Sequence, residues 1–267
     1  MITMSSRPQM AAPNVQSFAV PSVDLRHRVG TLYELAQQSD FVFGSPLGPF
    51  FIDAHAHYVP RFVYFGPHTS RESLRLAVLA GIGRHDRLAA NALLSFIEGL
   101  ARQPDIGQGL NVSFFPVVNV GGLLDGAEER DLTGDHWAHS GTPEITLLRQ
   151  DAERSGFQGF VRVTPTVDHE PSAWLRTVRS TTAQASDAEI FSSADFQPWP
   201  VSFETVAMDA VVSGPLSLGA ILPFAPFEVE LALPADWPQR RADQALAGIL
   251  KRLIVRYRGL LAYAQHL

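Results

Sequence analysis

The sequence predicts an α/β protein in which helices cover both faces of a sheet. Apolar runs typical of buried strands recur at 74–80, 110–119 and 157–163, and segments with helical spacing separate them at 88–100 and 143–154. An alternating strand and a long amphipathic segment complete the C-terminal part. This regular exchange of strand and helix is typical of α/β folds.

The composition limits the classes of function. The chain has 267 residues, 46% of them hydrophobic and 18% charged, with a formal net charge of −6. An acidic chain with a single lysine argues against nucleic acid as a partner, because phosphate binding needs a basic surface. No apolar run is long enough to span a membrane, so we expect a cytoplasmic protein. Since cysteine is absent, strong metal ligands could come only from His, Asp and Glu.

The N-terminal residues 1–20 are rich in Ser, Pro, Gln and Ala, and we expect them to form a flexible segment. Residues 21–267 contain no stretch that resembles an interdomain linker, so they are predicted to form a single domain. The first helix is expected from Leu25 to Gln38.

Two histidines alternate along a predicted strand, His55 and His57, after Asp53. Alternate strand residues share a face and can bind one ion, and this pattern resembles the start of an amidohydrolase metal site. Such barrels need further strand-end ligands and often a bridging lysine, but the only lysine here is Lys251, in the C-terminal helix. We therefore favour two solvent-facing histidines on an antiparallel strand and keep the amidohydrolase as an alternative.

The turn after the strand at 74–80 is the predicted place for a ligand, because open α/β sheets bind ligands at the carboxyl ends of their strands. It spans Gly83 to Arg87 and leads into the helix at 88–100. Farther along, 121–139 and 164–200 are predicted to be mostly loop, and 227–233 is expected to form a strand with one buried face.

These landmarks together resemble the zinc carboxypeptidase family, including its compact bacterial branch and the related aspartoacylase-like and succinylglutamate desuccinylase-like deacylases. The resemblance covers roughly 59–267 and consists of the following segments in order: Tyr-Val-Pro-Arg-Phe-Val-Tyr-Phe-Gly at 58–66, Leu-Ala-Gly-Ile at 79–82, Phe-Pro-Val-Val-Asn at 115–119 with Gly122, Asp131-Leu132 followed by Trp137, Ser140 and Pro143-Glu144, and the Glu230 strand before the last helix. It implies a three-layer α/β/α sandwich around a mixed, mostly parallel eight-stranded sheet.

The resemblance also implies a zinc ion, but the ligand positions are altered. The family holds zinc with a His-x-x-Glu after the central strand and a second His from a later strand. In this sequence those positions carry Gly83, Asp86 and Thr164. Glycine has no ligand atom, and the other two offer only oxygen, so the metal site is predicted to be degenerate and zinc to be absent or weakly bound. His85 and His169 are candidate replacements for the missing ligands. His136 and His139 lie in loops that the fold is expected to bring to the same end of the sheet.

Substrate and catalytic positions are partly kept. Where the family holds a substrate carboxylate with Asn-Arg, Asp131-Leu132 is followed by Thr133 and Gly134, and Arg130 lies close to the oxyanion arginine but out of register. Glu230 matches the family's general base on zinc-bound water. An ordinary solvent-facing carboxylate on an alternating strand explains Glu230 equally well.

Three functions follow as hypotheses. The first is a metallocarboxypeptidase-like hydrolase of amide or peptide bonds, and the second is an inactive relative, a pseudoenzyme that binds a ligand on the same fold. The third is the amidohydrolase built on His55 and His57. In the first two, the expected partner is a peptide or an acyl-amino-acid-like small molecule, with no nucleic acid or membrane.

Overall fold

The computed structural model describes residues 24–68, 73–103, 109–125, 130–133, 141–157, 159–177, 196–199, 201–207 and 227–265. Predictions made for residues 1–20, His136 and His139 lie outside these ranges. In the described part, no helix combines the length and the apolar character that crossing a bilayer requires.

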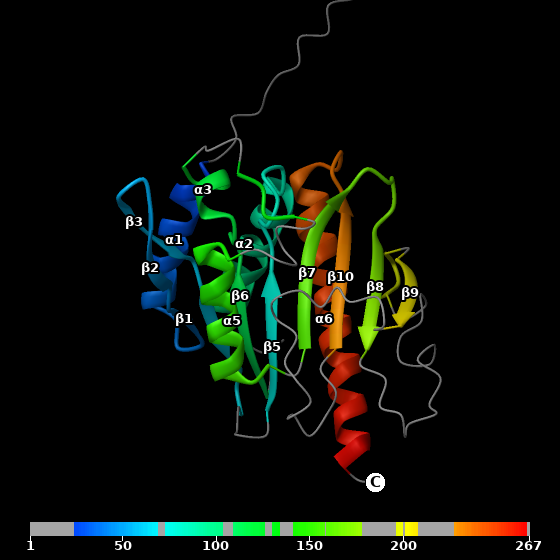
Figure 1. The fold of residues 1–267 in the computed structure, drawn as a ribbon. Helices are drawn as coiled ribbons and strands as arrows, with labels where there is room; N and C mark the ends of the chain where they lie inside the picture. The colour runs from blue at the N-terminus through cyan, green and yellow to red at the C-terminus, as the bar shows by residue number, and fades with distance from the viewer. Residues whose placement is uncertain are drawn as a thin grey trace, which may run out of the picture.

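An open eight-stranded sheet forms the centre of the described structure (Figure 1). Its strands follow the order β1 (Val42–Gly44), β4 (Phe62–Phe65), β6 (Leu110–Phe115), β5 (Leu74–Leu79), β7 (Gly159–Thr166), β10 (Phe227–Pro234), β8 (Ser172–Thr177) and β9 (Ser202–Ala207). The central strands β6, β5, β7 and β10 are parallel. β4 and β8 pair with them in the antiparallel sense, so the sheet is mixed with a parallel centre.

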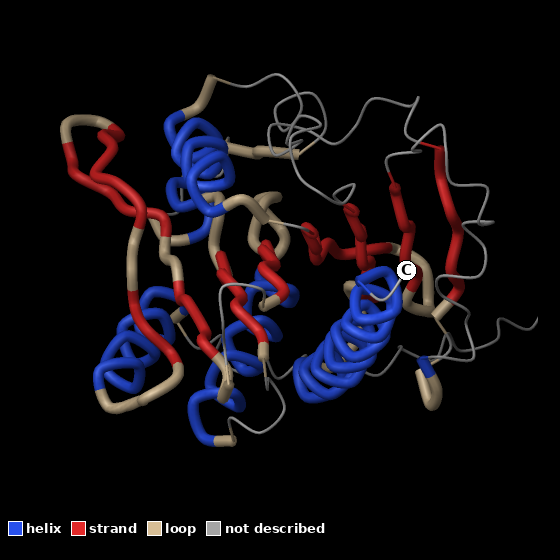
Figure 2. Tube along the Cα trace, turned by 90° about the horizontal axis from the view of Figure 1, so that it is seen from below, coloured by secondary structure: helices blue, strands red, loops and turns tan. Residues whose placement is uncertain are grey.

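Helices cover both faces of the sheet, as Figure 2 shows from below. The helices α1 (Leu25–Gln37), α2 (Arg87–Arg102) and α6 (Gln239–Gln265) pack in one hydrophobic core with one face of the sheet. The helix α5 (Pro143–Ser155) packs in a second core with the other face. The predicted three-layer α/β/α sandwich is therefore confirmed.

Strand β7 shows how the alternation of residues builds the two cores. Val161 and Val163 belong to the core with α2 and α6, whereas Phe160 belongs to the core with α5. A strand buried on both faces gains apolar contacts from each face, which explains why apolar residues predominate in it. Arg162 interrupts this run and is itself largely buried.

A separate hairpin lies beside α5 and consists of β2 (Leu47–Ile52) and β3 (His55–Val59). Its turn places Asp53 and Ala54 at φ 46° and 66°, the conformation that two-residue hairpin loops need to match strand twist. Arg61, which follows the hairpin, binds Asp151 of α5 and the hydroxyl of Ser45. These contacts tie the hairpin to the α5 layer.

Candidate functional site

Backbone hydrogen bonds fix the turn after β5 at the carboxyl edge of the sheet. The Gly81 carbonyl accepts the N–H groups of Val118 and Asn119 at 3.1 and 2.7 Å. Gly81 has φ +63°, and a Cβ there would lie 2.9 Å from the Pro116 carbonyl oxygen. Only glycine fits this position without strain, because it alone tolerates both the positive φ and the close backbone. The turn that follows is therefore held where a strand-end ligand would bind.

Asp86 closes this turn on itself. Its side chain is buried, and Oδ2 accepts the N–H groups of Ile82 at 3.1 Å and Gly83 at 2.8 Å. Burial raises the pKa of the Asp86 carboxyl, and the two amide donors oppose this in part. A Cβ on Gly83 would lie 2.9 Å from Asp86 Oδ1 and 3.0 Å from Thr133 Cγ2. The three residues are thus packed together, and the Asp86 carboxylate holds backbone amides.

Thr133 is also engaged in its own loop. Its N–H and its hydroxyl both donate to Asp131 Oδ1, at 3.0 and 2.8 Å. The neighbouring Arg130 donates from Nη2 to Glu144 Oε2 at 2.7 Å, and its backbone carbonyl accepts the Asn119 side-chain amide. Arg130 therefore joins this loop to the first turn of α5. The roles predicted for Thr133 and Arg130 in substrate binding stay predictions.

Glu144 receives this arginine inside the protein. Its side chain is fully buried, and Oε1 has no hydrogen-bond partner among the residues that the structure describes. Burial raises the pKa of the Glu144 carboxyl, while electrostatic interactions with Arg130 and His57 lower it. The Arg130 pair is consequently a structural anchor between α5 and the loop at 130–133.

Glu230 lies beside an arginine that the sequence reasoning did not single out. β10 runs parallel to β7 with Glu230 opposite Arg162, and Arg162 Nη2 donates to Glu230 Oε2 at 2.8 Å. The Glu230 side chain is 23% exposed and the Arg162 side chain is 9% exposed. Arg162 is also in register with Leu79 of β5, so the pair lies in the row where β5 ends. In the sequence, the presence of a single arginine within an apolar strand could have singled out Arg162 as a candidate site residue.

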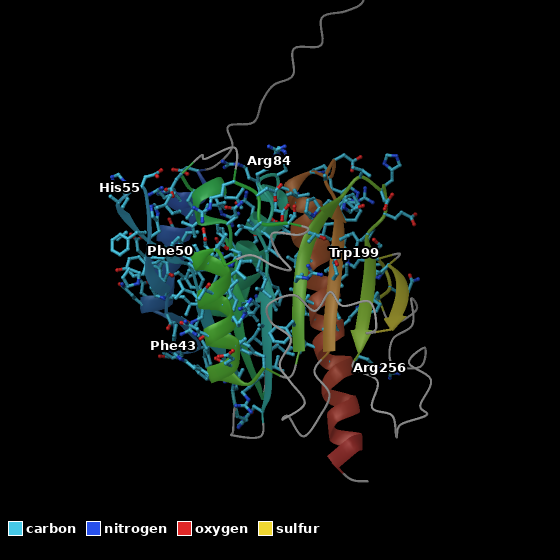
Figure 3. All side chains as sticks on the ribbon, viewed as in Figure 1. Phe43, Phe50, His55, Arg84, Trp199 and Arg256 are labelled. Atoms are coloured by element: carbon cyan, nitrogen blue, oxygen red, sulfur yellow. The ribbon has the colours of Figure 1, made fainter. Side chains whose placement is uncertain are left out.

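Thr164 lies two residues nearer the carboxyl edge than Arg162, opposite Ala232 of β10, and it is half-buried. The candidate replacement histidines have other partners. His85 is exposed and accepts a hydrogen bond from Arg84 Nε at 3.0 Å, and Arg84 extends from the upper edge in Figure 3. His169 is 91% exposed, with Nδ1 3.6 Å from Asp236 Oδ2.

His55 and His57 have different surroundings. His55 is exposed at the outer end of the hairpin (Figure 3), whereas His57 Nδ1 lies 3.1 Å from Asp125 Oδ2. The amidohydrolase alternative requires a closed barrel, but β1 and β9 lie at opposite ends of an open sheet. This alternative is wrong, because the histidines belong to a hairpin outside that sheet.

Zinc does not fit the side chains at the strand edge. Structural and catalytic zinc sites need several His, Cys, Asp or Glu ligands around one point. The described residues contain no group of three such side chains that could hold a metal. Asp86 already accepts two backbone N–H groups through Oδ2, and Gly83 offers no ligand atom. The described side chains at this edge therefore do not make up a zinc site.

Comparison with known proteins identifies the fold. No family model and no curated protein sequence matches the chain. Among solved structures, a metallo-carboxypeptidase from Burkholderia cenocepacia has a TM-score of 0.65 at 14% identity, covering 88% of this chain and 69% of that one. A metallo-carboxypeptidase from Pseudomonas aeruginosa, in complex with (2-guanidinoethylmercapto)succinic acid, has a TM-score of 0.65 at 16% identity, covering 86% and 68%. Bovine thrombin-activatable fibrinolysis inhibitor, in complex with tick carboxypeptidase inhibitor, has a TM-score of 0.60 at 11% identity, covering 87% and 96%.

These likenesses define the fold of the chain as that of the metallo-carboxypeptidases, which confirms the fold that the sequence resemblance implies. Fold alone does not determine function, because the same scaffold can host different sites. What the chain does therefore depends on the side chains at the strand edge.

Proposed function

We propose that this chain is a non-hydrolysing binding protein on the metallo-carboxypeptidase fold, and that it binds a peptide-like or acyl-amino-acid-like small molecule at the carboxyl edge of the sheet. The observation that carries the proposal is the hydrogen bonding of Asp86 to the N–H groups of Ile82 and Gly83. The carboxylate at the position of a metal ligand stabilises the turn instead.

The state of Glu230 supports the same proposal. A general base needs a carboxylate oxygen that can accept the proton of the attacking water. Glu230 Oε2 is engaged by the Arg162 guanidinium at 2.8 Å, so this oxygen is not presented to a water. The Glu230 side chain stays 23% exposed at the end of the central strands, where open α/β sheets bind ligands, so it is placed to contact a polar ligand.

The competing function is amide hydrolysis with Glu230 as general base. It is favoured by the position of Glu230 on β10, near the carboxyl edge of the sheet. It is also favoured by the fold, which the chain shares with metallo-carboxypeptidases. It differs from the binding function in one measurable property, which is turnover that depends on the Glu230 carboxylate.

The test begins with full-length protein purified without chelator. Zinc is measured by mass spectrometry and titrated by calorimetry, and hydrolysis of N-acetylaspartate, N-succinylglutamate and C-terminal dipeptides is assayed with and without added zinc. We expect substoichiometric zinc and no turnover. Turnover that disappears in Glu230→Gln would overturn the proposal in favour of the hydrolase.

The binding arm uses calorimetric titration with N-acetylaspartate and N-succinylglutamate. We expect saturable binding to the wild type that Arg162→Met weakens about tenfold, because a charge-assisted hydrogen bond is lost. The matched control is Arg240→Gln, an exposed arginine at the start of α6, which should leave affinity unchanged. Equal affinity in both variants would remove the strand-edge site as the place of binding.

A further inference from the structure

A cavity of about 300 Å³ lies on the other side of the molecule from the Arg162 and Glu230 pair, between α1, the β2–β3 hairpin and the short helix α3 (Val120–Leu123). None of the residues that line it belongs to the strand-edge site. In the sheet, β6 and β5 separate β4, which follows the hairpin, from β7 and β10. Its size is at the lower end of the roughly 300–1,000 Å³ typical of small-molecule pockets.

One end of the cavity carries an ionic cluster of Arg26, His57 and Asp125. Asp125 Oδ1 is bound by the Arg26 guanidinium, and Oδ2 lies 3.1 Å from His57 Nδ1. Arg26 also donates to the Leu124 carbonyl at 3.2 Å. Both Asp125 oxygens are thus engaged by basic side chains, whereas His57 Nε2 has no hydrogen-bond partner in the described part of the chain.

The remaining lining is largely apolar and comes from α1, from the two prolines that flank the hairpin strands, and from α3 with the residue after it: Val29, Tyr33, Pro46, Pro60, Val120 and Leu124. The Tyr33 ring packs on Phe62 with centroids 4.5 Å apart, and its hydroxyl accepts the Arg61 N–H at 3.3 Å. Burial raises the pKa of Tyr33 to about 12, so this wall adds no negative charge at neutral pH. The cavity therefore combines apolar walls with the ionic cluster of Arg26, His57 and Asp125 at one end.

From this arrangement we propose a binding site for a small aromatic carboxylate, with its ring between Tyr33 and the apolar walls and its carboxylate at His57 and Arg26. Asp125 is the acidic side chain of this cluster beside the two basic groups, while Glu144, which also interacts with His57, is paired with Arg130. The ligand's carboxylate adds a second acidic group to the cluster when His57 is protonated. Guanidinium and imidazolium groups form charge-assisted hydrogen bonds with such an anion. This proposal is independent of the function proposed for the strand edge.

The experiment titrates the full-length protein with 4-fluorobenzoate, followed by ¹⁹F NMR, with the neutral 4-fluorobenzamide as comparison. We expect saturable one-to-one binding of the acid and binding of the amide about tenfold weaker. His57→Gln should weaken the acid about tenfold, whereas His55→Gln, two residues away on the same strand and outside the cavity lining, should not.

A second variant fills the cavity without touching the ionic cluster. Ala56 lines the cavity and is exposed, and Ala56→Trp should abolish binding while thermal unfolding stays near the wild-type midpoint. Arg240→Gln, at an exposed arginine outside the cavity lining, should leave 4-fluorobenzoate binding unchanged. Absence of saturation, equal affinity for acid and amide, or equal loss in His55→Gln and His57→Gln would each overturn the proposal.

Discussion

Asp86 stabilises the turn by accepting two backbone N–H groups in a buried place. Removal of the carboxylate leaves both amides without their acceptor, which costs more than a typical exposed hydrogen bond. Asp86→Ala should lower the free energy of unfolding by about 2–3 kcal/mol, measured by urea denaturation. A change below about 0.5 kcal/mol would show that water replaces the carboxylate.

The raised pKa of Asp86 predicts a pH dependence. A carboxyl group whose pKa is higher in the folded chain stabilises the fold most below its unfolded value of 3.8, and this contribution is lost as the pH rises through the folded pKa. Asp86→Asn stays neutral and can accept the same N–H groups. Its stability relative to wild type should therefore rise from about pH 4 to about pH 7.

The matched control for that series is Asp40→Asn, at an exposed aspartate after α1. We expect its stability relative to wild type to show a smaller dependence on pH. Denaturation curves at several pH values measure both variants. If the stability of Asp86→Asn relative to wild type falls as the pH rises, burial is not the dominant influence on the pKa of Asp86.

Arg162 and Glu230 should show an energetic coupling. Each single variant, Arg162→Met or Glu230→Gln, leaves the remaining charge partly buried without the partner of this ion pair. We expect each to lower the free energy of unfolding by about 1–3 kcal/mol, with a coupling of about 1 kcal/mol in the double-mutant cycle. Additive effects would mean that the ion pair contributes no stability of its own.

At the scale of elements, two glycines predict opposite effects of the same substitution. Gly81→Ala imposes a positive φ on alanine and crowds the Pro116 carbonyl, so it should destabilise by at least about 2 kcal/mol. Gly99 lies inside α2, and a Cβ there would meet nothing within 4 Å. Gly99→Ala should stabilise by about 0.5–1 kcal/mol. Thermal denaturation of the pair tests the geometry of the β5 turn.

The strongly periodic elements could be predicted from the sequence. Helices α1, α2 and α5 begin and end within about two residues of the predicted limits, and β5, β7 and β10 lie where apolar runs indicated strands. The loop predicted at 121–139 was wrong at its start, because α3 spans Val120–Leu123. The segment 164–200 was predicted as loop with short elements, and β8 is such an element at Ser172–Thr177. Pairing with β10 and β9 rather than a local pattern determines β8.

The site was predictable only in its position. The order of motifs placed Gly83, Asp86 and Thr164 at the carboxyl edge, but hydrogen bonding to a residue's own turn leaves no trace in a sequence pattern. The Arg162 and Glu230 pair depends on β7 and β10 being neighbours, although 68 residues separate the two side chains. The cluster of Arg26, His57 and Asp125 joins three elements and could not be inferred from any one of them.

At the scale of the whole molecule, residues from both ends of the described chain share one core. Leu25 of α1 and Ile254 of α6 belong to the same hydrophobic cluster as the central strands. Loss of either helix would expose apolar surface of the other elements, so we expect cooperative unfolding as one domain. Tryptophan fluorescence and far-ultraviolet circular dichroism should give coincident urea transitions, and separate midpoints would contradict the single-domain prediction.

The end of the sheet at β1 has a consequence for self-association. β1 has only three residues, and the Tyr33 ring of α1 lies against Gly44, where an added Cβ would meet Tyr33 Cδ1 at 2.4 Å. A free strand edge offers unpaired backbone groups to other chains and can seed fibrils. Here the edge strand is only three residues long, so it offers few backbone groups to a strand of another molecule and is a poor template for growth of the sheet.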